Sequence, residues 1–227
     1  MTAAIRIEDL EFAYSPGNTV LKIKNFEVKQ GQHVFLHGPS GCGKTTLLGL
    51  ITGILSSQKG LIEILGTDIS QLKLKQRDAF RGNHLGYIFQ MFNLIPYLNV
   101  RENILLPIKM NSEKRKLSSD PDGEMKNLLS DLELSGYEDR PISELSIGQQ
   151  QRVAAARSLI GSPKLIVADE PTSALDYDNR ERFLDLLFKS ADKSGSTILF
   201  VSHDHSLAKL FPETMALKTI NQAGEQS

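Results

Sequence analysis

Short apolar segments alternate with longer amphipathic ones along most of this chain. Residues 33–37 (His-Val-Phe-Leu-His) and 165–168 (Leu-Ile-Val-Ala) are apolar runs of the length that forms buried strands. Residues 44–55 and 180–191 carry apolar side chains at helical spacing. Strands that alternate with helices predict an α/β fold with a mostly parallel sheet.

Other segments extend this pattern at the amino terminus and along the chain. Residues 5–14 alternate in part, so we expect either a strand pair or one bent strand, followed by a turn at Ser15-Pro16-Gly17-Asn18. Further short strands are expected at residues 26–28, 59–66, 85–90 and 197–201.

The middle of the chain has a different character. Residues 93–111 are apolar and contain two prolines, and residues 112–123 are polar, which favours an exposed loop. Residues 125–134 show apolar positions at three-to-four spacing, and residues 149–160 also favour a helix. We therefore expect a helical subdomain that interrupts the α/β pattern.

Composition limits the class of protein. The chain has 227 residues, of which 40% are hydrophobic and 23% charged, and a net charge of -1. This balance predicts a globular domain and argues against a nucleic-acid partner bound through a basic surface. No apolar run approaches the roughly 20 residues that span a bilayer, so no direct membrane span is expected. A single cysteine, Cys42, excludes an internal disulfide and suits a reducing compartment.

A glycine-rich segment follows the expected strand at residues 33–37. Gly38-Pro39-Ser40-Gly41-Cys42-Gly43-Lys44-Thr45 matches the pattern G-x-x-x-x-G-K-[ST], with Thr46 next. Glycines let backbone N–H groups approach phosphate oxygens, and the following helix directs its positive end at the same anion. Lys44 would supply charge to the phosphates, and the Thr45 hydroxyl would suit Mg²⁺. The segment predicts a nucleotide site.

Two carboxylates follow the apolar run at residues 165–168. Asp169 and Glu170 would lie at the carboxyl end of that strand, where open α/β sheets bind ligands. Asp169 would help to hold Mg²⁺, and Glu170 would orient and deprotonate an attacking water.

A further motif indicates the family. Leu145-Ser146-Ile147-Gly148-Gln149 resembles the LSGGQ signature of the ATP-binding cassette (ABC) ATPases, although Ile147 departs from the glycine of that pattern. Other positions similar to family motifs follow in family order. They are Tyr14 for adenine stacking, Gln90 for the Q-loop, Ser173-Ala174-Leu175-Asp176 for the D-loop, and the switch histidine His203. The segment after His203 departs from the family pattern and leaves the last strands open.

The resemblance implies a fold and a domain organisation. It implies one ABC ATPase domain over residues 1–227, of the P-loop NTPase class, with a RecA-like mixed sheet and an antiparallel β subdomain. Residues 1–90 and 150–227 would form this core, and residues 91–149 the inserted helical subdomain, with the signature at its end.

The resemblance also implies an ATP hydrolase with ATP and Mg²⁺ as cofactors. The implied catalytic residues are Glu170, His203, Gln90 and Lys44, and the implied Mg²⁺ ligands are Thr45, Gln90 and Asp169. The implied ATP contacts are Tyr14, residues 38–46, Ser146, Gly148 and Gln149. A second cassette, expected to be identical, would supply the signature to the same nucleotide, and the D-loop residues would lie at that dimer contact.

Residues 86–96 and 103–107 most resemble the lipoprotein-release and macrolide-efflux (LolD/MacB-type) subgroup. This implies a separate transmembrane permease, an output of export or extraction from the membrane, and a peripheral place on the inner face of the cytoplasmic membrane. Phe92, Leu94, Tyr97 and Leu98 are the implied permease contacts. An importer ATPase, or an ABC ATPase that signals without moving substrate, remains the alternative.

Overall fold

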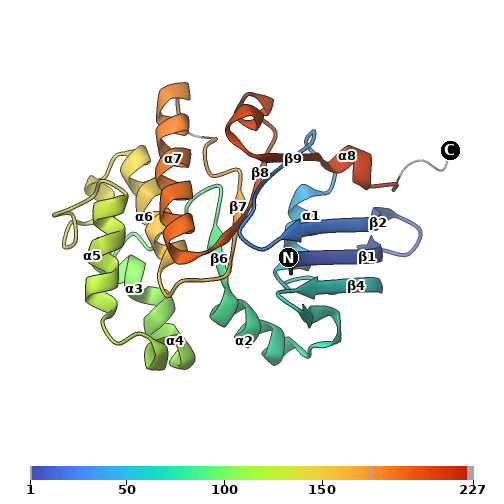
Figure 1. The fold of residues 1–227 in the computed structure, drawn as a ribbon, viewed down its shortest axis with the longest axis horizontal. Helices are drawn as coiled ribbons and strands as arrows, with labels where there is room; N and C mark the ends of the chain where they lie inside the picture. The colour runs from blue at the N-terminus through green and yellow to red at the C-terminus, as the bar shows by residue number, and fades with distance from the viewer. Residues whose placement is uncertain (1, 174, 224–227) are drawn as a thin grey trace. The chain divides into compact units, whose positions relative to one another are not determined.

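The structure is a computed structural model that describes residues 2–173 and 175–223. It contains two compact units, one drawn from Met1–Arg81 and Thr197–Ser227 and the other from Gly82–Ser196. Each unit combines strands with helices, as the ribbon in Figure 1 shows. The expected α/β class is confirmed. Residues 91–149, expected as an inserted helical segment, lie within the second unit.

An antiparallel sheet forms one part of the first unit. Its strands are β1 (Ala3–Ala13), β2 (Thr19–Lys29), β4 (Lys59–Ile64) and β5 (Thr67–Asp68), in the order β2-β1-β4-β5. Burial alternates along β2, so one face of the sheet packs inward. Of the two possibilities for the amino terminus, the structure shows one bent strand, because the register of β1 shifts at three irregularities against its neighbours.

Parallel strands form the other part of the first unit. Strand β3 (His33–His37) lies between β8 (Thr197–Ser202) and β9 (Glu213–Ala216) and is parallel to both. Every residue of β8 and all but the last of β3 are buried, which explains their continuous apolar sequences. Between β8 and β9 the chain forms the 3₁₀ helix η3 (His205–Leu210). The closing strand that the sequence left open is therefore β9.

Helix α1 (Lys44–Ile51) follows β3 and ends four residues earlier than the expected boundary at residue 55. The Thr52 N–H caps the helix by donating to the Leu48 carbonyl, and Gly53 has a φ of +69°. A left-handed residue at this place ends a helix, and glycine adopts that conformation without strain. The first unit continues through η1 (Ile69–Gln71) into α2 (Leu74–His84).

The second unit contains two parallel strands and most of the helices. Strand β6 (Leu85–Ile88) pairs with β7 (Leu165–Asp169). The remaining elements are α3 (Val100–Met110), α4 (Ser112–Leu117), α5 (Pro121–Asp131), η2 (Ile142–Glu144), α6 (Ile147–Leu159) and α7 (Tyr177–Ser194). Helix α6 contacts α3, α5, α7 and β6. It is therefore central to this unit.

The expectation of a loop over residues 112–123 is wrong. This segment holds α4 and the start of α5, because two polar side chains cap these helices. The Asn111 side chain accepts hydrogen bonds from the Glu113 and Lys114 N–H groups, and the Asp120 side chain accepts one from the Gly123 N–H. Capping satisfies N–H groups that a short polar helix leaves unpaired, which periodicity alone does not reveal.

The helices are too short or too polar to span a membrane in the part of the chain that the structure describes. Within residues 2–173 and 175–223, no helix has both the length and the apolar character that crossing a bilayer requires.

The carboxyl-terminal segment is anchored by Asn221, which follows α8 (Leu217–Ile220). Its Oδ1 accepts hydrogen bonds from the Lys22 N–H (2.8 Å) and the Ala223 N–H (3.1 Å). Its Nδ2 donates to the carbonyl oxygens of Val20 (3.0 Å) and Cys42 (3.4 Å). One amide therefore joins the end of the described chain to β2 and to the glycine-rich loop.

We expect Asn221→Ala to lower the free energy of unfolding by about 2 kcal/mol, because each lost hydrogen bond contributes about 0.5–1.5 kcal/mol. Chemical denaturation measures this change. Asn221→Asp is the matched control, since it keeps an acceptor oxygen and loses the amide donors. Its free energy of unfolding should lie between those of the parent protein and Asn221→Ala. An Asn221→Ala variant as stable as the parent protein would contradict the anchoring role.

Candidate functional site

The glycine-rich loop lies between β3 and α1, as its pattern predicts. Gly41 and Gly43 have φ values of +78° and +101°, which favour glycine. A Cβ on Gly43 would also lie 2.8 Å from Leu21 Cδ2, so the position has no room for a side chain. The first turn of α1 contains no acidic residue. The positive end of this helix therefore remains available to an anion.

Lys44 is held within the loop that it belongs to. Its side chain is buried, and its Nζ donates to the carbonyl oxygens of Gly38 (2.8 Å) and Pro39 (2.9 Å). The ammonium charge is thereby held beside the glycine-rich backbone, where an anion would bind. Thr45 is exposed, so its hydroxyl is accessible at the start of α1.

Tyr14 lies close to the start of α1. Its side chain is 65% exposed, and its hydroxyl forms a hydrogen bond of 3.1 Å with Thr46 Oγ1. The Phe12 ring packs edge-on against it, with centroids 5.0 Å apart. An exposed aromatic ring that is fixed beside a phosphate loop suits the predicted stacking on a base.

Strand register places His203 close to the same loop. The last residue of β3, His37, pairs with Ser202 at the end of β8, and both strands run in the same direction. Gly38 and His203 are therefore the next residues at neighbouring strand ends. The His37 and His205 rings meet edge to face, with centroids 4.3 Å apart. Burial lowers the pKa of His37 and the proximity of His205 lowers it further, which favours the neutral imidazole.

In the second unit, β6 and β7 bring together three of the predicted polar residues. Ile88 pairs with Ala168, so Gln90 and Glu170 each lie two residues beyond that pair, at the carboxyl ends of parallel strands. Asp169 is the last residue of β7. Gln90 itself is exposed. The two strands thus group an amide and two carboxylates at one edge.

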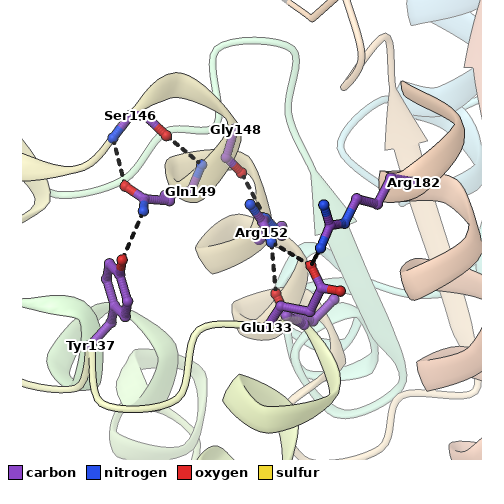
Figure 2. Close-up of polar contacts among 8 residues, drawn as sticks. Glu133, Tyr137, Ser146, Gly148, Gln149, Arg152 and Arg182 are labelled. Atoms are coloured by element: carbon purple, nitrogen blue, oxygen red, sulfur yellow. Dashed lines mark hydrogen bonds and ion pairs between the residues drawn. The ribbon is translucent and has the colours of Figure 1, made fainter. Parts of the chain in front are cut away.

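The signature segment begins α6. Ser146 is the N-cap, and it forms a capping box in which its Oγ accepts from the Gln149 N–H and Gln149 Oε1 accepts from the Ser146 N–H (Figure 2). Gln149 Nε2 also donates to the Tyr137 hydroxyl, at 3.1 Å. Among the described residues, a Cβ on Gly148 would meet only Leu175 Cδ2, at 3.9 Å, which is an ordinary contact. This helix start also lacks an acidic residue.

Glu133 connects the signature helix to α7. Its Oε2 pairs with Arg152 Nη1 of α6 at 3.0 Å and with Arg182 Nη2 of α7 at 2.7 Å (Figure 2). The hydrogen bond from Arg182 and the charges of both arginines lower the pKa of Glu133, so the carboxylate remains charged at neutral pH. Glu133 itself has a φ of +57°. This ion-pair cluster orients α6 relative to the helix that follows the D-loop.

The D-loop residues precede α7. Asp176 is the N-cap of this helix, and hydrogen bonds from Asn179 lower the pKa of its carboxyl. Leu175 is buried and Ser173 is exposed. The fourth predicted residue, Ala174, lies outside the described residues.

The four residues predicted to contact a permease differ in exposure. Tyr97 is 84% exposed, whereas Phe92 is only 8% exposed and belongs to the core of the second unit. Leu94 and Leu98 are half-buried. Sequence reasoning overlooked Met91, which is 81% exposed, because a single methionine carries no periodic signal. A contact surface here would therefore use Tyr97 and not the Phe92 ring.

The loop that carries Tyr97 is held by Asn103, which is fully buried. Asn103 Oδ1 accepts from the Ile95 N–H at 2.8 Å, and its Nδ2 donates to three carbonyl oxygens, those of Ile95, Leu98 and Asn99. The sequence does not identify this residue, because an asparagine in a helix does not indicate which groups its side chain hydrogen-bonds to.

Comparison with known proteins shows the family of this chain. Residues 21–173 match the ABC transporter family. The chain belongs to the ABC transporter family. It is 38% identical over 199 residues to the lipoprotein-releasing system ATP-binding protein LolD of Bacteroides fragilis, covering 86% of this chain and 89% of that protein. It is 39% identical to the bacitracin export ATP-binding protein BceA of Halalkalibacterium halodurans, covering 88% and 78%.

A solved structure of a dimeric ATP-binding cassette in a post-hydrolysis state, bound to ADP and Pi, is also similar. Its TM-score is 0.78 at 32% identity, and the match covers 93% of each chain. The P-loop NTPase fold is therefore confirmed, and the chain is an ATP-binding ABC ATPase that hydrolyses ATP.

Tyr87 is a further residue of this ABC ATPase that the sequence did not reveal. Its hydroxyl donates a hydrogen bond to the Asp169 carboxylate. Burial raises the pKa of Tyr87 above its ordinary value, and Asp169 raises it further, so the hydroxyl remains protonated at neutral pH. The pairing of Tyr87 with Val167 across β6 and β7 creates this contact, and only the sheet register determines it.

We expect Tyr87→Phe to raise the Mg²⁺ concentration needed for half-maximal ATPase activity roughly tenfold, because groups that orient a metal ligand contribute 10- to 100-fold to affinity. A titration of ATPase rate against Mg²⁺ at saturating ATP measures this. Tyr97→Phe is the control and should leave the curve in place. An unchanged Mg²⁺ dependence in folded Tyr87→Phe would contradict a role of Tyr87 in orienting the Asp169 carboxylate for Mg²⁺.

Proposed function

We propose that this chain is the ATP-hydrolysing motor of a transporter. Two identical chains close head to tail on two ATP molecules and drive a separate transmembrane permease, with export or extraction of a substrate from the membrane as the output. The observation that carries the proposal is the start of α6. An uncharged helix start with no side chain at Gly148 is a second anion site in a chain that already has a phosphate loop.

Dimer closure gives that second site a function. In the proposed pair, Ser146 and Gly148 of one chain contact the nucleotide held by the phosphate loop of the other. The similar solved cassette, which is dimeric and bound to ADP and Pi, supports a pair of chains as the working unit. The D-loop residues Ser173, Leu175 and Asp176, together with Ala174, would lie at the contact.

The proposed chemistry distributes roles among the predicted residues. Tyr14 stacks on the base, and Lys44 neutralises phosphate charge together with the backbone N–H groups of residues 38–46 other than Pro39. Glu170 orients the attacking water and accepts its proton, and His203 contacts the γ-phosphate. Because the partner's signature completes the site, hydrolysis depends on closure.

The residues fit Mg²⁺. Thr45 and Gln90 are exposed and Asp169 is oriented by Tyr87, so a hydroxyl, an amide carbonyl and a carboxylate supply the oxygen atoms that Mg²⁺ prefers. One carboxylate is sufficient when substrate phosphates supply other ligands. When bound, Mg²⁺ neutralises charge that develops on the phosphates.

The permease contact is proposed at the loop around Tyr97. An exposed tyrosine on a loop held by buried Asn103 offers a rigid apolar surface to a helix of the permease. Such a contact would hold the chain on the inner face of the cytoplasmic membrane. Similarity to relatives named for lipoprotein release and bacitracin export supports export or extraction as the output.

We expect Glu170→Gln to bind Mg-ATP and to hydrolyse it at least a hundredfold more slowly, because a positioned base contributes roughly 10²–10⁴-fold. The trapped ATP should hold the chain as a dimer in size-exclusion chromatography with light scattering. Glu213→Gln, at an exposed glutamate of β9, is the matched control and should turn over ATP normally.

A second substitution separates the sandwich from other dimers. Gly148→Asp adds a carboxylate to the first turn of α6, where it favours the helix dipole but repels a phosphate. The double variant Gly148→Asp with Glu170→Gln should therefore be folded, bind ATP and remain monomeric. If it dimerises as well as Glu170→Gln does, the signature does not contact the partner's nucleotide.

We expect Tyr97→Asp to abolish permease-stimulated ATPase activity in proteoliposomes while the isolated chain keeps its basal rate, because a buried charge at the contact is costly. The permease to use is the membrane protein that copurifies with this chain. Loss of ATP binding in Tyr97→Asp would show a role in folding instead. Stimulated ATPase activity without movement of a substrate would support signalling. Movement of the substrate toward the side of the membrane where this chain hydrolyses ATP would support import.

A further inference from the structure

Gln151 joins the signature helix to the segment that follows Glu170. It is located on α6, three residues after Gly148, and it is fully buried. Its Nε2 donates a hydrogen bond of 3.0 Å to the carbonyl oxygen of Pro171. This bond spans 20 residues of sequence and ends at the carbonyl of the residue that directly follows the proposed catalytic base.

The backbone at that base is strained. Glu170 has a φ of +46°, in the left-handed region that residues other than glycine rarely adopt. A residue that precedes proline prefers extended backbone, which adds to the strain. Such residues cost of order 1–3 kcal/mol and persist only where their surroundings hold them. The Gln151 amide is one of the groups that hold this turn, together with the bond from the Ser173 N–H to the Glu170 carbonyl, at 3.2 Å.

The other end of the same amide is not satisfied. Gln151 Oε1 is buried and has no hydrogen-bond partner among the described residues. A buried acceptor without a partner costs about 1–3 kcal/mol. A methionine of similar length would occupy the same space without that cost. The Oε1 atom of Gln151 thus lowers the stability of the fold, whereas its Nε2 atom holds the Pro171 carbonyl beside the proposed base. This combination is typical of a residue kept for activity.

We propose that Gln151 is a positioning residue for ATP hydrolysis, which conveys the position of the signature helix to Glu170 through the Pro171 carbonyl. The proposal rests on the proposed roles of Glu170 and of the signature. Gly148 and Gln151 are one turn apart on a single helix, so a displacement of its start by a bound phosphate also moves the Gln151 amide. Glu170 then takes its productive orientation when the signature is engaged, and hydrolysis in the open state is suppressed.

The test replaces Gln151 by methionine, which removes the donor and the unpaired acceptor together. We expect the kcat of Gln151→Met to fall roughly ten- to hundredfold, because small misplacements of a catalytic group have effects of this size. The KM for ATP should remain within about twofold, since no ATP contact is removed. The thermal midpoint should be equal to that of the parent or higher, because a buried unpaired acceptor is lost.

Ser158→Ala is the matched control. Ser158 is a buried polar residue of the same helix, but its hydroxyl bonds only to Ala155 within that helix, so kcat should remain near the parent value. A Gln151→Met enzyme with parental kcat would overturn the proposal. So would a KM that rises in parallel with the loss of kcat. Gln151→Leu provides a second apolar variant, and failure of both to fold would show that the residue is structural.

The trapping experiment separates this inference from the proposed function. If Glu170→Gln does not dimerise with Mg-ATP, the proposed function fails, whatever Gln151 does. If Glu170→Gln dimerises and Gln151→Met hydrolyses ATP normally, only the inference fails. Gln151→Met combined with Glu170→Gln should still dimerise, because the phosphate loop and the signature are intact.

Discussion

Backbone N–H groups at the start of a helix have no partners inside that helix, and this constraint underlies the functional arrangement. At the start of α1 the glycine-rich loop leaves these groups to an anion, and no acidic side chain competes for them. At the start of α6 a capping box provides hydrogen-bond acceptors for two of the N–H groups, those of Ser146 and Gln149. Gly148, between them, carries no side chain that would occupy the space beside the helix start. The proposed sharing of nucleotides between two chains accounts for two such helix starts in one ABC ATPase.

In the second unit, the structure holds polar groups in positions that cost free energy. Glu170 adopts left-handed backbone, and Gln151 Oε1 has no partner among the described residues while Gln151 Nε2 holds the Pro171 carbonyl. Tyr87 keeps its proton beside the Asp169 carboxylate. Each of these features lowers stability or adds a specific bond at a predicted catalytic residue, which is where folded proteins tolerate strain.

The ion-pair cluster at Glu133 has a different physical character. Its three members are partly exposed, so each pair contributes little to the free energy of folding. The cluster instead restricts the orientation of α6 and α7, because one carboxylate accepts from arginines of both helices. Together with the Gln151 bond to the Pro171 carbonyl, it gives the signature helix one polar link to the segment before the D-loop and one to the helix after it.

The sequence by itself determined the α/β class, the phosphate loop and the family, because each depends on residue types at short, regular spacing. Helix α4 and the first turn of α5 were not predicted, since single caps at Asn111 and Asp120 define them, whereas the apolar spacing over residues 125–134 predicted a helix over the rest of α5. The burial of Phe92, the bond from Tyr87 to Asp169 and the bond from Gln151 to Pro171 were decided only by the tertiary structure. These contacts join residues far apart in the chain, and strand register and helix packing, which no local pattern encodes, bring them together.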